Sequence, residues 1–299
     1  MGKLAIMSDL HVDINKLEKQ ELNQLITVLK RHHITHLHLA GDTANTVERL
    51  LATTHFIEQS GISVTFNFGN HELASIKNSH KMEEYPEPHF LNATSIDLND
   101  QLVLLGVNGW YDYSFALEKD QSKIIAAKNL YWYDRVIERN ASDPEILSQI
   151  LNRLSLALDT LKKKKKKVII ATHFVPKQEF IRYFTGEYER WNQINAFLGS
   201  TATGELFDSY DNIQQVIFGH THRRFENKKM NQITYSARPL GYFYEWYLTK
   251  NFMLENNLMT SFNPYKVRRL LRNHQESFNS YRLAHLEEEF TQALTIIEY

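Results

Sequence analysis

The chain has 299 residues, of which 42% are hydrophobic and 23% are charged, as in a globular protein that buries a large core. Its formal net charge is −1, so no overall positive field favours nucleic acid or an anionic membrane as a partner. It contains no cysteine, which excludes disulfides and thiolate metal sites and agrees with a reducing compartment. No apolar run approaches the length of a membrane span. We therefore predict a soluble, cytoplasmic protein.

The first 70 residues alternate between strand and helix patterns. The apolar positions Leu22, Leu25, Ile26 and Leu29 repeat with the spacing of one helical face. Alternation of this kind predicts an α/β fold with parallel strand pairs. The predicted elements are strands at 4–7, 34–40 and 62–66, a helix that begins near Glu18, and a helix at 47–57.

The rest of the chain contains a long helical insert, further strands and a helical tail. The motif Ser142-Asp143-Pro144-Glu145 predicts a helix start, because proline is tolerated in the first turn. We found no internal repeat and no Gly/Ser-rich linker. We therefore predict one elaborated domain at 1–245, with an aromatic, mostly helical insert at about 108–161, and a helical extension at 246–299 packed on it. The predicted later elements are strands at 102–107, 168–171, 216–218 and 232–236 and a helical tail from about 265.

Five predicted strands end in residues that can bind a metal ion. Each motif alone is typical of a cap or a turn. In α/β sheets, however, ligands bind outside the carboxyl ends of the strands, so five motifs at strand ends indicate one shared site. The five motifs are Asp9-Leu10-His11, Gly41-Asp42, Gly69-Asn70-His71-Glu72, Thr172-His173 and Gly219-His220-Thr221-His222.

These residue types suit a pair of divalent metal ions. Borderline divalent metals bind imidazole nitrogen and carboxylate or amide oxygen. Two ions held about 3.5–4 Å apart need one bridging ligand and a water or hydroxide between them. Two dications, two Asp carboxylates and one hydroxide leave a charge of about +1, which favours a phosphate anion. The candidate ligands are Asp9, His11, Asp42, Asn70, His173, His220 and His222.

The order of these motifs resembles that of the calcineurin-like metallophosphoesterase superfamily. The resemblance covers about residues 3–242. It implies a four-layer α-β-β-α sandwich, in which two mixed β-sheets lie back to back with helices outside. It further implies two metal sites that share Asp42. The first would comprise Asp9, His11, Asp42 and His222, and the second Asp42, Asn70, His173 and His220.

His71 resembles the acid of this superfamily, which faces the leaving-group oxygen, with Glu72 as its orienting partner. The residues themselves support this role. If Asn70 places its amide oxygen on a metal, the next side chain points elsewhere at the rim of the site, where an imidazole can protonate an alkoxide. The alternatives are that His71 is a turn residue or a hydrogen-bond partner of a ligand, and that Glu72 merely begins the next helix.

Two departures argue against the protein Ser/Thr phosphatases of this superfamily. Those enzymes carry Asp-Arg-Gly after the second motif, whereas Thr43 follows Asp42 here. They also carry Gly-Gly after the later histidine, whereas Phe174 follows His173. The long stretch between Asn70 and His173 predicts an insert that shapes a lid.

The sequence does not decide the roles of the aromatic and arginine side chains outside the motifs. The aromatic residues of the insert and those after His173 either form a stacking wall for a leaving group or pack the core. Any of several arginines could bind a phosphate oxygen, and the sequence singles out none. The arginines in question are Arg182, Arg190, Arg223, Arg224 and Arg238.

We therefore predict a dinuclear metal-dependent phosphoesterase in which a metal-bridging hydroxide attacks phosphorus and His71 protonates the leaving group. N/O ligands do not choose among Mn, Fe, Zn, Co and Ni. Small nucleotide-like phosphodiesters are slightly favoured as substrates. The alternatives are a phosphomonoesterase or nuclease on the same scaffold, and a non-catalytic scaffold that binds proteins. We expect no membrane partner, the neutral net charge argues against nucleic acid, and the sequence does not indicate the oligomeric state.

Overall fold

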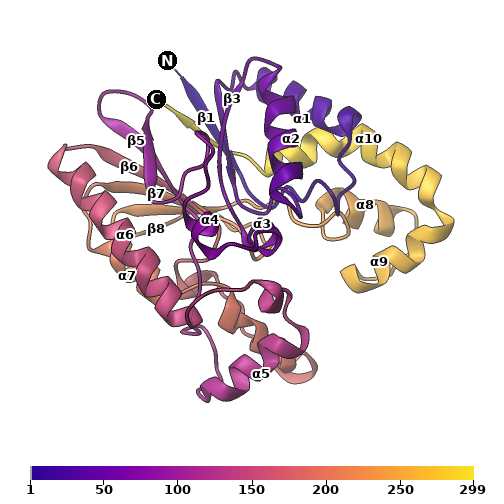
Figure 1. Ribbon diagram of the computed structural model, residues 1–299. Helices are drawn as coiled ribbons and strands as arrows, with labels where there is room; N and C mark the ends of the chain where they lie inside the picture. Colours follow the sequence, from indigo (N-terminus) through magenta and orange to yellow (C-terminus); the bar gives the residue numbers. More distant parts are fainter. Residues whose placement is uncertain (1) are drawn as a thin grey trace.

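A computed structural model describes residues 2–299, which form two β-sheets stacked face to face with helices outside (Figure 1). The first sheet has the order β10-β1-β2-β3, in which β10 is antiparallel to β1 and the other pairs are parallel. The second has the order β4-β5-β6-β7-β9-β8 and is parallel except for the two outer pairs. The prediction of two mixed sheets flanked by helices is confirmed.

The strands place apolar residues on both faces, as expected for sheets that are covered on both sides. Those of the first sheet are β1 (Lys3–Met7), β2 (His36–Ala40), β3 (Ser63–Asn67) and β10 (Thr295–Glu298). Those of the second sheet are β4 (Thr94–Asp97), β5 (Leu102–Val107), β6 (Lys167–Thr172), β7 (Ile213–Phe218), β8 (Lys228–Met230) and β9 (Ile233–Ala237). The short strands β4, β8 and β10 were not predicted.

A thin apolar layer joins the two sheets. Leu4 and Ile6 of β1 lie in one buried cluster with Leu104, Ile169 and Ile217 of the second sheet. Because this layer holds the sheets in one fixed arrangement, the carboxyl ends of β1, β2, β3, β6 and β7 open toward the same region.

The inner face of the first sheet also carries a buried polar pair. His38 is paired in register with Ile6 and Thr65, so all three share the inner face. Its Nδ1 lies 2.9 Å from Thr65 Oγ1, and its Nε2 lies 3.0 Å from Asn67 Oδ1. Both ring nitrogens are thus occupied within the sheet, so His38 is not a metal ligand in this arrangement.

Helices cover the outer faces of both sheets. Figure 1 shows α1, α2 and α10 beside the first sheet and α6 and α7 beside the second. The α-helices are α1 (Lys19–Arg31), α2 (Val47–Glu58), α3 (Asn70–Ser75), α4 (Ser79–Glu83), α5 (Gln121–Tyr131), α6 (Asp143–Lys163), α7 (Thr201–Asp208), α8 (Tyr247–Glu255), α9 (Pro264–Leu270) and α10 (Gln275–Gln292). The 3-10 helices are η1 (Tyr133–Val136), η2 (Gln178–Phe180), η3 (Gly186–Phe197) and η4 (Leu271–Asn273).

The start of α6 follows the sequence prediction. The backbone N–H of Ser142 donates to Glu145 Oε2 at 3.0 Å, which closes a capping box around Pro144. Within the predicted insert, helix is limited to α5, η1 and α6, because residues 108–120 contain no helix. Figure 1 shows α5 projecting away from the sandwich, at the bottom of the view.

The tail is helical up to α10 and then differs from the sequence prediction. Ile297 was expected on the helical face, but it lies in β10 and pairs with Leu4 of β1. The physical reason is that β1 would otherwise present an unpaired edge, and a short apolar segment can complete it. Residues 246–299 therefore contribute α8, α9, α10 and one strand of the first sheet.

Over residues 2–299, no helix combines the length and the apolar character needed to cross a membrane.

A buried carboxylate ties α4 to the insert. Glu83 accepts hydrogen bonds from the guanidinium groups of Arg139 and Arg153, and from Asn92 Nδ2 at 2.9 Å. The side chain of Arg139 is only 4% exposed, so its charge depends on this partner. Burial alone would raise the pKa of Glu83, but Arg139 and Arg153 lower it below its usual value.

We expect Glu83→Gln to lower the free energy of unfolding by about 1–3 kcal/mol at neutral pH, because Arg139 stays buried without its counter-charge. Since the folded-state pKa is lowered, the stabilisation is complete above the ordinary value of 4.5 and is lost as pH falls through the folded-state pKa. Urea denaturation across this acid range measures both effects. Glu84→Gln, at an exposed neighbour, is the matched control. Equal stability of the two variants would contradict the assignment.

Candidate active site

The strand-end residues occupy an uncommon backbone conformation. Left-handed φ angles occur at Asp9 (57°), His11 (45°), Asp42 (52°), His220 (69°) and His222 (53°). Such angles are rare for residues other than glycine and cluster at functional sites. Five of the seven predicted ligands thus sit in tight turns that direct their side chains toward one region.

Glu72 holds two of these turns together. Its Oε2 accepts from the backbone N–H of Asp42 at 3.0 Å and of Gly69 at 2.9 Å. Its Oε1 accepts from the N–H of Ala44 at 2.8 Å. Burial and the charge of Asp42 raise the pKa of Glu72 to about 7. Glu72 therefore positions the loops after β2 and β3, and the prediction that it orients His71 is wrong.

Two glycines allow the ligands to approach the backbone. A Cβ atom at Gly69 would lie 2.2 Å from Asp42 Oδ1. At Gly219, it would lie 2.1 Å from Asp9 Oδ2. Any larger residue would therefore displace a carboxylate at each of these positions.

All seven predicted ligands converge, in two groups that share Asp42. In the first group, His222 Nε2 lies 3.0 Å from His11 Nε2 and 3.4 Å from Asp9 Oδ1. Asp42 Oδ2 lies 3.8 Å from the same nitrogen of His11.

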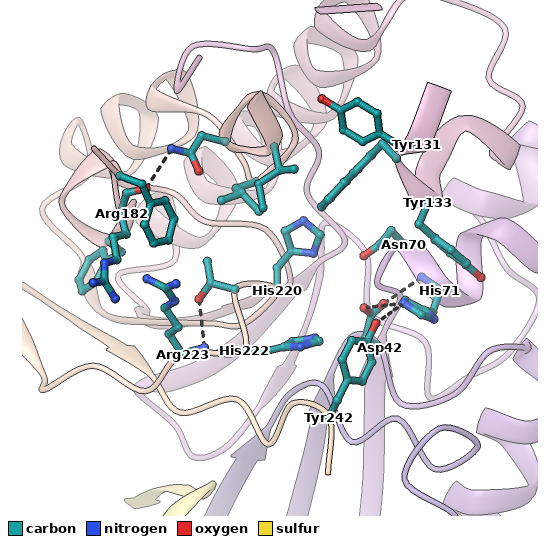
Figure 2. Close-up of a pocket in the computed structure, with 17 residues that line it drawn as sticks. Asp42, Asn70, His71, Tyr131, Tyr133, Arg182, His220, His222, Arg223 and Tyr242 are labelled. Atoms are coloured by element: carbon teal, nitrogen blue, oxygen red, sulfur yellow. Dashed lines mark hydrogen bonds and ion pairs between the residues drawn. The ribbon is translucent and has the colours of Figure 1, made fainter. Parts of the chain in front are cut away.

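The second group forms around His173. Its Nε2 lies 3.0 Å from His220 Nδ1 and 3.1 Å from Asn70 Oδ1. Asp42 Oδ2 lies 3.4 Å from this same Nε2, so the carboxylate stands between the two groups. Figure 2 shows Asp42, Asn70, His220 and His222 facing one cavity.

Three of these histidines each form a hydrogen bond through the ring nitrogen that points away from the centre of the site, here called the outer nitrogen. These bonds show whether the other, inner nitrogen is free to bind a metal. His222 Nδ1 lies 2.9 Å from Glu245 Oε2, and His220 Nε2 lies 3.1 Å from Phe197 O. His173 Nδ1 lies 3.3 Å from Ala40 O. These partners are acceptors, so the outer nitrogens carry the hydrogen and the inner nitrogens offer lone pairs. The inner nitrogens of His173 and His220 then face each other with lone pairs at 3.0 Å, a donor arrangement that a metal ion between them would satisfy. His222 Nε2 likewise offers a lone pair toward His11, whose Nδ1 has no hydrogen-bond partner.

The pKa values of the four histidines in these groups are shifted by burial and by nearby carboxylates. Burial alone would lower the pKa of His173 and His222, but Asp42 raises the first to about 9 and Glu245 raises the second to about 10. Burial does lower the pKa of His220 to about 3 and that of His11 well below its usual value. In each facing pair, a carboxylate therefore raises the pKa of one histidine and burial lowers the pKa of the other.

His71 lies beside the shared carboxylate and at the cavity wall. Its Nε2 is 3.8 Å from Asp42 Oδ2 and 3.3 Å from the hydroxyl of Tyr242. Its Nδ1 is 2.9 Å from Asn45 Oδ1, so Asn45 is the partner that orients the ring. The ring stacks on Tyr133, with centroids 4.3 Å apart.

The cavity has a volume of ≈ 350 Å³, and its walls combine polar, charged and aromatic side chains. The aromatic residues of the insert divide into two sets. Trp110, Tyr111, Tyr113 and Phe115 are buried in the core, where packing was one of the two interpretations. Residues 131–133 line the cavity, which agrees with the second interpretation. The aromatic and arginine residues of its walls are Tyr131, Trp132, Tyr133, Phe180, Arg182, Phe184, Arg223 and Tyr242.

Sequence reasoning missed the residues that orient the ligands. Glu245 binds His222, and Asp134 Oδ1 accepts from Asn70 Nδ2 at 2.9 Å. Glu245 follows Tyr242 closely in the chain, so its location next to the site offered a weak signal. Asp134 lies in the insert, and no motif distinguished it.

Comparison with known proteins assigns the family. The sequence model described as calcineurin-like phosphoesterase matches residues 2–224, about three quarters of the chain. The chain belongs to the calcineurin-like phosphoesterase family. This phosphoesterase is therefore a metal-dependent hydrolase of phosphate esters, which confirms the predicted enzyme class. The family uses two divalent metal ions, and two of the His/Asp groups that could hold a metal are Asp9-His11-His222 and Asp42-His173-His220.

A solved structure shares the fold of this phosphoesterase. A phosphopantetheinyl hydrolase from Mycobacterium tuberculosis matches with a TM-score of 0.58 and 16% identity, over 81% of this chain and 90% of that one. At this identity, the likeness concerns the fold alone. A dimetal phosphatase from Danio rerio matches with a lower TM-score of 0.49 and 13% identity, over 80% of this chain and 87% of that one. No curated protein sequence matched the chain.

We expect Asp134→Ala to weaken metal binding in the Asn70–His173–His220 group by about 10- to 100-fold, because the Asn70 amide loses the partner that directs its oxygen inward. Asp134→Asn keeps an acceptor oxygen and should lose less. Mn²⁺ titration by calorimetry measures both variants, with circular dichroism to verify folding. Wild-type affinity in Asp134→Ala would exclude a positioning role for Asp134.

Glu245→Ala is expected to weaken metal binding in the other group, Asp9–His11–His222, by a similar factor of about 10 to 100. The reason is that Glu245 fixes which nitrogen of His222 faces inward. Glu245→Gln retains an acceptor and serves as the milder companion. Because the two groups differ, Glu245→Ala and Asp134→Ala should each spare one of the two ions bound by the wild type. Loss of both ions in either variant would argue that the two groups do not bind metal independently.

Proposed function

We propose that this enzyme hydrolyses a small, nucleotide-like phosphodiester and that His71 protonates the leaving group. The observation that carries the proposal is the division of the cavity into two unlike ends. His71 and Tyr133 lie at one end, and Arg182, Phe184 and Arg223 lie at the other, with His220 and His222 between them (Figure 2). A phosphodiester carries two substituents on phosphorus and would occupy both ends, whereas a monoester would occupy one.

The candidate metal ligands would supply the electrophilic centre. When bound, two divalent ions chosen among Mn, Fe, Zn, Co and Ni would activate a water molecule and neutralise charge on the phosphoryl oxygens. Asp9, His11, Asp42 and His222 would hold one ion, and Asp42, Asn70, His173 and His220 the other. The backbone N–H of His71 donates to Asp42 Oδ1 at 2.9 Å, which fixes the carboxylate that both groups share.

The surroundings of His71 direct Nε2 toward the cavity. Nδ1 donates its hydrogen to Asn45 Oδ1, so Nε2 carries a transferable proton only when the ring is cationic. Burial lowers the pKa of His71, and the charge of Asp42 opposes this shift only in part, so the acid in the proposed reaction is the cationic form of the ring. Stacking on Tyr133 restricts rotation of the ring. An exposed aromatic pair, Tyr131 and Tyr133, borders this end and could contact a base or aryl leaving group.

Three alternatives have less support. A monoesterase would leave the arginine end of the cavity unused. A nuclease would need a basic surface for the polymer, and the net charge is −1. A non-catalytic scaffold would not need seven converging ligands with their hydrogen-bond partners. A cytoplasmic location stays a prediction from composition.

We expect the Mn²⁺-loaded enzyme to cleave aryl phosphodiesters with a higher kcat/KM than the matching monoesters. In His71→Ala, kcat for an alkyl leaving group should fall by about 10²–10⁴, and by much less for p-nitrophenol, which departs without a proton. Asp42→Asn should lose metal and activity toward every ester. Steady-state kinetics on this panel measures these effects.

His55→Ala, an exposed histidine of α2, is the control and should behave as the wild type. Equal losses for both leaving groups in His71→Ala would remove His71 as the acid. Loss of bound metal in that variant would favour a ligand role instead. Tight metal binding without hydrolysis of any ester would overturn the catalytic proposal itself.

A further inference from the structure

Two arginines lie beside one aromatic ring, that of Phe184, at the end of the cavity opposite His71. The guanidinium carbon of Arg182 lies 5.0 Å from the ring centroid of Phe184, and that of Arg223 lies 5.4 Å from the same centroid. All three residues line the cavity, and Figure 2 shows Arg182 and Arg223 side by side. Two like charges are thus gathered at one place, which is unfavourable unless an anion binds between them.

No carboxylate within residues 2–299 lies at ion-pair distance from either guanidinium. The nearby carboxylate of Glu245 is already engaged by His222 Nδ1 at 2.9 Å and by the N–H of Tyr242 at 3.2 Å. Arg224, the next residue after Arg223, differs because it forms an ion pair with Glu289 at 2.6 Å. The positive charge of Arg182 and Arg223 is therefore available to a ligand.

The segment that carries Arg182 and Phe184 is held in place. Asn192 Oδ1 accepts from the N–H of Phe184 at 2.7 Å, and Asn192 Nδ2 donates to Phe184 O at 2.9 Å. Asn195 Nδ2 donates to Arg182 O at 3.1 Å. Both asparagines are buried in η3. Arg223 directly follows His222, a predicted metal ligand, and is half-buried. Arg182 and Arg223 are therefore both carried by backbone segments that other contacts hold in place.

We propose that Arg182, Arg223 and the face of Phe184 form a subsite for a second phosphate group, carried by the part of the substrate that remains on phosphorus after cleavage. This inference rests on the proposed function. Two guanidinium groups match a phosphate dianion in both charge and planar donor geometry. The location opposite His71 assigns the second phosphate to the retained substituent, because the leaving group must lie beside the acid.

The test compares p-nitrophenyl diesters whose retained alkyl chain ends in either a phosphate or a hydroxyl group, over a series of chain lengths. The leaving group is constant, so only the distal group changes. In the wild type, the phosphate-ended diester of best length should have a kcat/KM about tenfold or more above its hydroxyl partner. Arg182→Gln/Arg223→Gln should abolish this preference, mainly through KM, because the phosphate-ended diester loses far more kcat/KM than its hydroxyl partner does.

The matched control is Arg269→Gln/Arg272→Gln, which removes the same charge from exposed positions outside the cavity and should keep the preference. Calorimetric binding of the phosphate-ended diester to His71→Ala, with and without the two Gln substitutions, gives a readout that needs no turnover. A wild type that cleaves both diesters equally at every length, and binds them equally, would overturn the subsite alone. A parallel loss of activity on the hydroxyl-ended diesters would also overturn it, because the arginines would then serve the reacting phosphoryl group. Failure to cleave any ester would instead count against the proposed function.

Discussion

The carboxylate of Asp42 is the contact on which the rest of the site depends. One oxygen accepts from the backbone N–H of His71, and the other faces histidines from both sheets, His11 after β1 and His173 after β6. This position is possible only because Gly69 lacks a side chain and Glu72 binds the N–H of Asp42 itself. A buried anion at the junction of two sheets needs positive charge nearby. The histidines that converge on Asp42, and the groups around it that could hold a metal ion, meet that requirement.

Much of the fold, and the residues that converge at the candidate site, could be predicted because both depend on local patterns. Short apolar runs mark strands that are buried on both faces, and candidate ligands such as Asp9 and His173 follow them directly. The strand β10 could not be predicted, since a segment such as 295–298 fits a helix or a strand equally well and the free edge of β1 decides. The role of Asp134 could not be predicted either. Asp134 reaches Asn70 only because the insert folds back onto the site, and the spacing of residues in the sequence carries no information about that contact.

The strand-end motifs and the segments between them form different parts of the site. The strand ends build the floor of the site, which the family shares. The walls come from residues 131–133 of the insert and from the segment around Phe184, which are outside the motifs. Composition could not tell that Trp110 packs the core while Trp132 faces the cavity, because both belong to the same aromatic stretch. The walls of the cavity therefore come largely from the segments that pattern recognition describes least well.

The pairing of β10 with β1 has a consequence for the order in which the protein assembles. The strand that leads directly into Asp9 and His11 has an antiparallel neighbour that is separated from it by most of the described chain and is synthesised much later. Backbone bonds between Gly2 and Tyr299, at 2.9 and 3.0 Å, extend this pairing. Contacts between residues so distant in sequence form slowly, because a long loop must close first. Until residues 295–298 dock, the strand that leads to two candidate metal ligands has an open edge, so a segment made late completes the support of residues made early.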